Sequence, residues 1–295
     1  MSTITEGPED CVPENRASGF LRQTFIMFKR WSVKTARNPM VTFMSLVQPV
    51  IFFVLVVEVF GAIAGDAVQT NYIAFLTPAV IVQSGLAAAS VSGIGLVHDI
   101  DTGMFDKVLA SPIHRGAMFL GKALSVVVRI VIQTILILAL AFGLLVLDGN
   151  ASVSSFIQTG VVGFFGILLI TVLFAGIFMA FSNIVALKSR DQEATIMIAN
   201  LLTFPLLFIS PAFLPLSALP DWIQTVAVLN PITYGVDGIR ALILDADVMT
   251  VIEVSWFSGP MNTVVPAVLV CLAFSVVLGA VAVRLLNNAS KADVR

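Results

Sequence analysis

The stretch HDIDTGMFDKVLASPIHRGAMFLGK (residues 98–122) is a polar segment between two long runs that lack charged residues, 67–97 and 130–147. Further uncharged blocks cover 149–187, 194–220 and 254–283, and 40–57 is a shorter run of the same kind. A helix needs about 20 apolar residues to cross about 30 Å of hydrocarbon. The uncharged runs therefore predict membrane-spanning helices, and the polar segment is expected to face water.

The composition agrees with a membrane protein. The 295 residues are 58% hydrophobic and 12% charged, with a mean hydropathy of +1.00, whereas about 25% of a soluble domain is charged. We predict an all-α polytopic membrane protein with six transmembrane helices, near 39–59, 72–97, 118–147, 155–185, 194–216 and 262–286. The remaining divisions are a disordered tail (1–15), an interfacial helix (16–38), a transmembrane domain (39–287) and a C-terminal tail (288–295).

The distribution of Lys and Arg predicts the orientation. They gather before the first span, between the second and third, between the fourth and fifth, and after the sixth, whereas Arg240 stands alone in the segments of the other side. Short cytoplasmic loops retain an excess of basic residues. Both termini are therefore expected to be cytoplasmic, with the chain in the cell membrane.

The helix expected over 16–38 has two faces at 100° per residue. Five basic residues fall on one arc and six apolar ones on the opposite arc: Arg22, Lys29, Arg30, Lys34 and Arg37, against Phe20, Leu21, Phe25, Met27, Phe28 and Trp31. This pattern is typical of a helix that lies at the bilayer surface. A simple topology anchor would explain the basic charge equally well.

The polar segment contains a near match to a phosphate-binding loop at 116–123. Position 123 is Ala, which offers no hydroxyl to Mg²⁺, and no strand precedes the match. No other nucleotide-binding, hydrolytic or redox motif is present, and neither Cys11 with Cys271 nor His98 with His114 has the spacing of a metal site. We therefore expect no enzymatic activity, and no cofactor, metal or nucleic acid bound by this chain.

The polar segment also predicts a short helix along the membrane surface. Asp99 and Asp101 would lie near its start, where acidic side chains suit the positive helix end, and 111–112 (Ser-Pro) would end it. Its apolar residues could seal the neighbouring spans. Alternatively, the helix could dock in a groove of a partner, as amphipathic helices commonly do.

Two motifs carry a family resemblance. The run DTGMFDKVLASP (101–112), followed by Arg115, Gly121 and Lys122, resembles the cytoplasmic loop of ABC type-2 exporter permeases, particularly the daunorubicin-resistance and nodulation-exporter branch. The segments ISPAFLP (209–215) and LNPITYGVDGIR (229–240) resemble the signature that follows the fifth span in that family. The resemblance implies that two six-helix subunits pair, and that each rests on a separate cytoplasmic ATPase, which binds ATP and Mg²⁺.

The resemblance also implies roles for particular residues. The segment 16–38 would be the connecting helix, and 211–245 would form re-entrant or surface helices on the outer side. The ATPase-coupling helix would contain Asp99, Asp101, Gly103, Met104, Phe105, Asp106, Lys107, Leu109, Ser111 and Pro112. The outer signature would contain Pro211, Pro215, Pro220, Asn230, Pro231, Tyr234, Asp237 and Arg240.

Two charged residues within or beside spans are candidate pathway residues. Glu58 ends the first span on the outer side, where it could cap a transport pathway or simply touch water. Arg129 lies about seven residues, or roughly 10 Å, inside the third span. Charge in a membrane often marks a transport pathway, but this depth also lets an arginine reach the cytoplasmic surface.

Together these patterns predict the permease subunit of an ATP-driven exporter for a hydrophobic or amphipathic substrate, such as a drug, a lipid or a glycolipid-like molecule. Sodium efflux is an alternative, although no span has a carboxylate at its centre. The other alternative is a secondary transporter or a structural membrane protein, without an ATPase.

Overall fold

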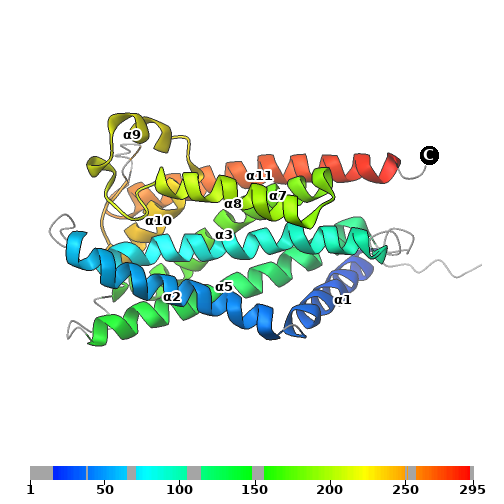
Figure 1. The fold of residues 1–295 in the computed structure, drawn as a ribbon, viewed down its shortest axis with the longest axis horizontal. Coiled ribbons are helices and arrows are strands. Elements are labelled where there is room, and N and C mark those ends of the chain that lie inside the picture. Colours follow the sequence, from blue (N-terminus) through cyan, green and yellow to red (C-terminus); the bar gives the residue numbers. More distant parts are fainter. Residues whose placement is uncertain are drawn as a thin grey trace, which may run out of the picture.

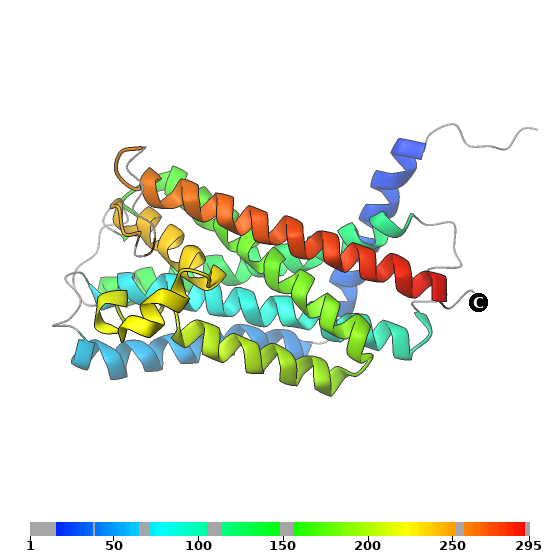
Figure 2. The ribbon, with the colours of Figure 1, turned by 90° about the horizontal axis from the view of Figure 1, so that it is seen from above.

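The computed structural model describes residues 16–37, 39–64, 71–104, 114–147, 156–249, 251 and 257–292. Within these ranges the chain is helical and has no strand. Long helices form a bundle, and α1 (Arg16–Ala36) crosses one end of it at a steep angle (Figure 2). The other long helices are α2 (Pro39–Ala64), α3 (Tyr72–Asp101), α5 (Arg115–Leu147), α7 (Gly160–Ser189), α8 (Gln192–Phe208) and α11 (Met261–Ala292).

Four helices in the described part of the chain are long and apolar enough to cross a membrane. They are α3, α5 over Gly116–Leu147, α7, and α11 over Met261–Leu285. Helix α2 contributes an apolar run over Val47–Val59, and α8 is 17 residues long. Four of the six predicted spans thus have helices of sufficient length and hydropathy, and the six-span topology stays a prediction.

The predicted fifth span, 194–216, extends too far. Helix α8 ends at Phe208, and its last carbonyls are satisfied by the backbone N–H of Ile209, which lies close to the Leu207 and Pro205 oxygens. Pro211 and Pro215 follow, and a proline has no N–H with which to continue a helix. The fourth span also shifts, because α7 begins at Gly160, where φ is +64°.

Helix α3 is the centre of the bundle. It packs against α2, α5, α7, α8 and α10 (Pro231–Leu244), and 67% of its candidate span is buried, compared with 11% for α11. A Cβ at Gly93 would lie 2.5 Å from the Ser182 carbonyl oxygen on α7. This small-residue position therefore serves close packing within one subunit.

Three short helices lie between α8 and α11, at the end of the bundle away from α1 (Figure 1). They are η1 (Leu216–Ala218), α9 (Asp221–Ala227) and α10. Helix α10 packs among α3, α7 and α11 and is buried over most of its length. Its depth relative to the bilayer stays a prediction. The C-terminal end of α11 lies at the same end of the bundle as α1 (Figure 1).

Candidate functional site

Helix α1 is held against α5 by a close backbone contact. Met27 and Trp31 on the contacting face are 4% and 9% exposed. A Cβ at Gly121 of α5 would lie 2.5 Å from the Met27 Cβ and 2.8 Å from the Thr24 carbonyl oxygen and the Phe28 nitrogen. Any larger residue would push the helices apart, because backbone atoms cannot move aside separately.

The outer face of α1 differs from the predicted pattern. Leu21, Phe25 and Ile26 are exposed at 72%, 62% and 52%, whereas Met27 and Trp31 are buried in the protein. The prediction of a single apolar arc facing lipid is therefore wrong for this helix. Helix α5 covers only one part of the arc, so Met27 and Trp31 are buried while Leu21 and Phe25 remain exposed.

A buried carboxylate joins α1 to the end of α3. Asp99 is 2% exposed, and the Lys34 ammonium donates a hydrogen bond of 3.0 Å to its Oδ1 atom. The Arg30 guanidinium lies 3.9 Å from its Oδ2 atom. Because the Asp99 side chain is shielded from water, these basic side chains stabilise its charge.

The predicted start of the coupling helix is wrong. Asp99 and Asp101 belong to the last turn of α3, which ends at Asp101 with Thr102 as its cap. Gly103 follows in a left-handed conformation, with φ +64°, a common way for a helix to end. Asp101 accepts a hydrogen bond of 3.1 Å from the Gln192 side chain of α8. The helix continues because Leu96, Val97 and Asp99 are buried in the protein.

Six predicted coupling residues lie outside the described part of the chain: Phe105, Asp106, Lys107, Leu109, Ser111 and Pro112. The two ends of the segment 105–113 are nevertheless placed. Met104, 38% exposed, is the last residue before it. After it, the His114 N–H donates a hydrogen bond of 2.9 Å to Gln23 Oε1 of α1, and the Phe20 and His114 rings meet edge to face at 5.7 Å. Helix α1 thus contacts Asp99, in the last turn of α3 before the segment, and His114, directly after the segment.

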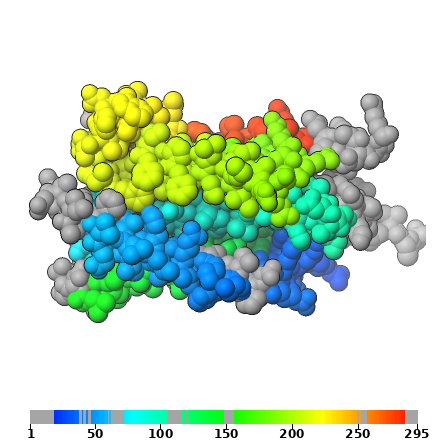
Figure 3. Space-filling model, viewed as in Figure 1, coloured from blue at the N-terminus to red at the C-terminus, as the bar shows by residue number. Residues whose placement is uncertain are grey.

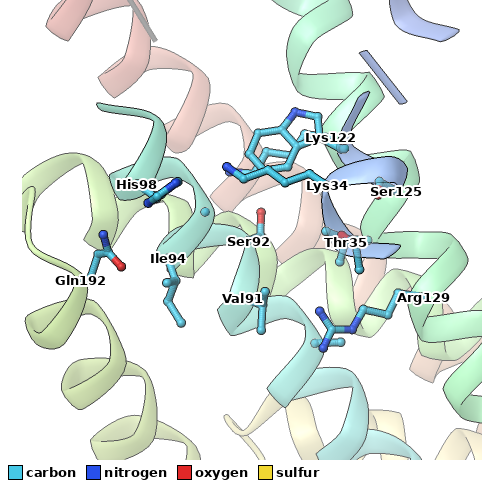
Figure 4. A pocket seen from close by; sticks show the side chains of 14 residues that line it. Lys34, Thr35, Val91, Ser92, Ile94, His98, Lys122, Ser125, Arg129 and Gln192 are labelled. Carbon is cyan, nitrogen blue, oxygen red and sulfur yellow. The ribbon is translucent and has the colours of Figure 1, made fainter. Parts of the chain in front are cut away.

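A cavity of about 250 Å³ lies beside this junction, between α1, α3 and α5 (Figure 4). Its α5 wall consists of residues at positions i, i+3, i+4 and i+7, which share one helix face. The polar side chains that line it are Lys34 and Thr35 of α1, Ser92 and His98 of α3, Lys122, Ser125 and Arg129 of α5, and Gln192 of α8. Among the described residues, no group of His, Cys, Asp or Glu could hold a metal ion.

The Trp31 ring contacts two of the ammonium groups that line this cavity, those of Lys34 and Lys122. Lys34 Nζ lies 4.9 Å and Lys122 Nζ 5.1 Å from the ring centroid, within the range of a cation–π interaction. Lys122 is 3% exposed and donates a hydrogen bond of 3.4 Å to Asn183 Oδ1 of α7. Ser92 donates to the same oxygen at 3.2 Å.

The outer signature forms a second polar cluster, at the opposite end of the bundle. Arg240 of α10 is 3% exposed, donates to the Pro211 carbonyl at 2.8 Å and to the Phe75 carbonyl at 3.2 Å, and lies 3.5 Å from Asp237 Oδ1. Its guanidinium lies 3.8 Å from the Phe75 ring centroid. Burial lowers the pKa of Arg240 to about 10, and Asp237 opposes the shift, so the guanidinium remains charged near neutral pH.

The other signature residues also shape the backbone there. Asn230 accepts a hydrogen bond from the Ile232 N–H and donates one of 2.6 Å to the Leu206 carbonyl, while Tyr234 donates to the Val228 carbonyl at 2.8 Å. The prolines precede or begin helices: Pro215 precedes η1, Pro220 precedes α9, and Pro231 is the first residue of α10. These contacts join the end of α8, the end of α9 and the start of α10.

The two candidate pathway residues lie in different surroundings. Glu58 is exposed on α2. Arg129 faces the cavity, fourteen residues after the start of α5 at Arg115, or about 21 Å along the helix. Its depth in the membrane stays a prediction.

Sequence reasoning did not find the cavity. It considered Lys122 only as part of a false phosphate-loop match and of the cytoplasmic loop, and counted Lys34 and Trp31 as parts of a surface helix. The spacing of Lys122, Ser125 and Arg129 on one helix face was a usable signal. The residues that complete the cavity, on α1 and α3, have no such sequence relation to them.

Known proteins resemble this chain over most of its length. The family model for the ABC-2 type transporter matches residues 22–244, from α1 to the end of α10. The ycf38 transport permease of Cyanophora paradoxa is 28% identical over 249 residues, which cover 81% of this chain and 81% of that protein. The daunorubicin resistance ABC transporter permease protein DrrB1 of Streptomyces coeruleorubidus is 29% identical over 203 residues, or 67% of this chain and 66% of that one.

Proposed function

The chain belongs to the ABC-2 type transporter family, and from this premise we propose that it is the membrane permease subunit of an ATP-driven exporter. Its cargo would be a hydrophobic or amphipathic molecule that leaves the cell. Drug, lipid and glycolipid-like molecules fit this description, and one relative is named for daunorubicin resistance. The chain would cross the cell membrane six times, with both termini in the cytoplasm.

The chemical step would take place on another protein. A separate cytoplasmic ATPase would bind ATP and Mg²⁺, and this chain would receive the resulting movement through the segment around 104–114. The family normally works with such an ATPase. The permease itself would catalyse no reaction.

The observation that carries this proposal is the position of α1 between the two ends of that segment. Lys34 joins α1 to Asp99 before the segment, and Gln23 joins it to His114 after it. A force on the segment would therefore reach α1, α3 and α5 together. Because α3 packs against five other helices, their displacement would tilt the bundle, as in rigid-body switching.

A second permease subunit would pack on an apolar face that the subunit leaves open. Helices α2 and α8 flank α3 on one side of the molecule (Figure 3). On α8, Met197, Leu201, Phe204 and Phe208 are 70%, 76%, 53% and 64% exposed and share one helix face. Lipid would cover whatever part of this face the second subunit does not.

Asp99→Asn tests the transmission of force. The substitution removes the charge that holds Lys34 and Arg30, so we expect ATP-dependent transport to fall about fivefold, at the lower end of typical coupling free energies. Hydrolysis by the ATPase would continue. The measurement is transport and hydrolysis by the complex reconstituted in vesicles, with Glu193→Gln, an exposed acid on α8, as the matched control. Unchanged transport by Asp99→Asn would remove this junction from the mechanism.

The proposed function itself is tested by isolating the chain from its native membrane in a mild detergent. We expect an ABC ATPase to co-purify, with two permease subunits in each complex. In inside-out vesicles, the complex should take up fluorescent amphiphiles only when ATP is present. A chain that purifies without an ATPase and moves these probes down an ion gradient would be a secondary transporter instead.

A further inference from the structure

The cavity between α1, α3 and α5 has an excess of positive charge. Lys34, Lys122 and Arg129 line it, and no carboxylate does among the residues that the structure describes. Asp99 pairs with Lys34 and Arg30 from beside the cavity. Within the described part of the chain, Lys122 and Arg129 have no carboxylate within salt-bridge distance. Buried cations of this kind are costly unless an anion accompanies them.

Among the described residues that line the cavity, Arg129 most clearly lacks hydrogen-bond partners. Its Nε and Nη2 atoms are buried and have no hydrogen-bond partner among the described residues. Buried donors are nearly always paired, so an orphaned guanidinium calls for an acceptor. A planar guanidinium pairs best with a group that offers two oxygens side by side. Figure 4 shows Lys122 and Lys34 close together in the upper part of the view, with Arg129 below them.

We propose that this cavity binds the phosphate group of an anionic lipid from the cytoplasmic leaflet. A phosphodiester has several acceptor oxygens and a full negative charge, which together suit an arginine and two lysines. The cavity of about 250 Å³ is several times larger than the roughly 30 Å³ that one water occupies, so it has room for a phosphate with part of its glycerol. The cation–π contacts of Trp31 hold both ammonium groups toward this space.

The surroundings favour a lipid over a free ion. A shallow groove on the outer side of α1 is lined by Phe25, Ile26 and Val33 together with Lys29 and Arg37, and it shares Lys34 with the cavity. Apolar side chains beside basic ones are typical of a helix at a bilayer surface. Acyl chains could therefore lie along this groove while the phosphate occupies the cavity. The inference concerns binding only and is independent of the proposed cargo.

The test uses the full chain in nanodiscs of phosphatidylcholine, with and without phosphatidylglycerol, and native mass spectrometry to count the lipid retained. We expect one phosphatidylglycerol to stay bound to the wild type. Lys122→Gln and Arg129→Gln should each lower its affinity about tenfold, since each removes one charge-assisted contact. Arg129→Lys should recover only part of it, because lysine keeps the charge but loses the paired N–H donors of the guanidinium. Lys188→Gln, which removes an exposed lysine on α7, is the matched control.

Two results would overturn the proposal. Radiolabelled inorganic phosphate that binds the wild type in pure phosphatidylcholine, in place of retained phosphatidylglycerol, would assign the cavity to a free ion. Equal retention by the wild type, Lys122→Gln and Arg129→Gln would remove these side chains from lipid binding. Elution of all variants at the wild-type volume in size-exclusion chromatography verifies that they are folded.

Discussion

Arg240→Met is expected to lower the stability of the purified protein more than any other single substitution considered, by about 3–5 kcal/mol. The guanidinium joins three parts of the chain, because it donates to the Phe75 carbonyl of α3 and the Pro211 carbonyl after α8 while it pairs with Asp237 on α10. Methionine has similar length but no charge. It would leave the Asp237 carboxylate, 0% exposed, without its basic neighbour.

Thermal unfolding in detergent micelles measures this effect, with Arg284→Met on the exposed side of α11 as control. The double variant Arg240→Met with Asp237→Asn should recover part of the loss, because it no longer buries a carboxylate without its arginine. An Arg240→Met protein that melts within about 2 °C of the wild type would show that the cluster does not stabilise the fold.

Gly121→Ala should separate α1 from α5 and so disconnect transport from the ATPase. Overpacking costs about 1–3 kcal/mol in a tight core, and here the obstructing atoms include the backbone of Thr24 and Phe28. We expect transport to fall about tenfold, within the usual range of coupling free energies. The measurement is ATP-driven uptake into vesicles, together with protease accessibility of α1.

Gly143→Ala is the matched control, since it makes the same change on the same helix. A Cβ at Gly143 would meet no atom within 4 Å, and alanine favours helix by about 1 kcal/mol over glycine. Gly143→Ala should therefore transport at the wild-type rate. If Gly121→Ala does so too, the close contact between α1 and α5 is not needed for function.

Much of the helix layout follows from hydropathy and charge. The uncharged runs over 67–97 and 130–147 became parts of α3 and α5, because apolar residues of that length are stable in a bilayer only as helices. Helix ends were less predictable. Asp99 looked like the start of a new helix, yet α3 continues past it, because the cations that stabilise its charge come from α1, 65 residues away.

The outer signature was recognisable in sequence, but its interactions were not. Asn230 and Pro231 begin α10, since the amide caps the first turn and proline suits the first position, but the sequence was interpreted only as surface or re-entrant helices over 211–245. That Arg240 would turn inward to the Phe75 and Pro211 carbonyls depends on how three distant segments pack. The residues of 105–113 lie outside the described chain, so their predicted coupling role stays a prediction.

The sequence by itself determined that this chain is a helical membrane protein and which family it resembles, because hydropathy and local motifs are properties of neighbouring residues. Only the tertiary structure decided that α1 contacts Asp99 near the end of α3 and His114 after the segment that follows it, and that Lys34, Lys122 and Arg129 share one cavity. The physical reason is that Lys34 comes from α1 whereas Lys122 and Arg129 come from α5, far away in the sequence. Their burial, and hence their need for an anion, arises only when the helices pack.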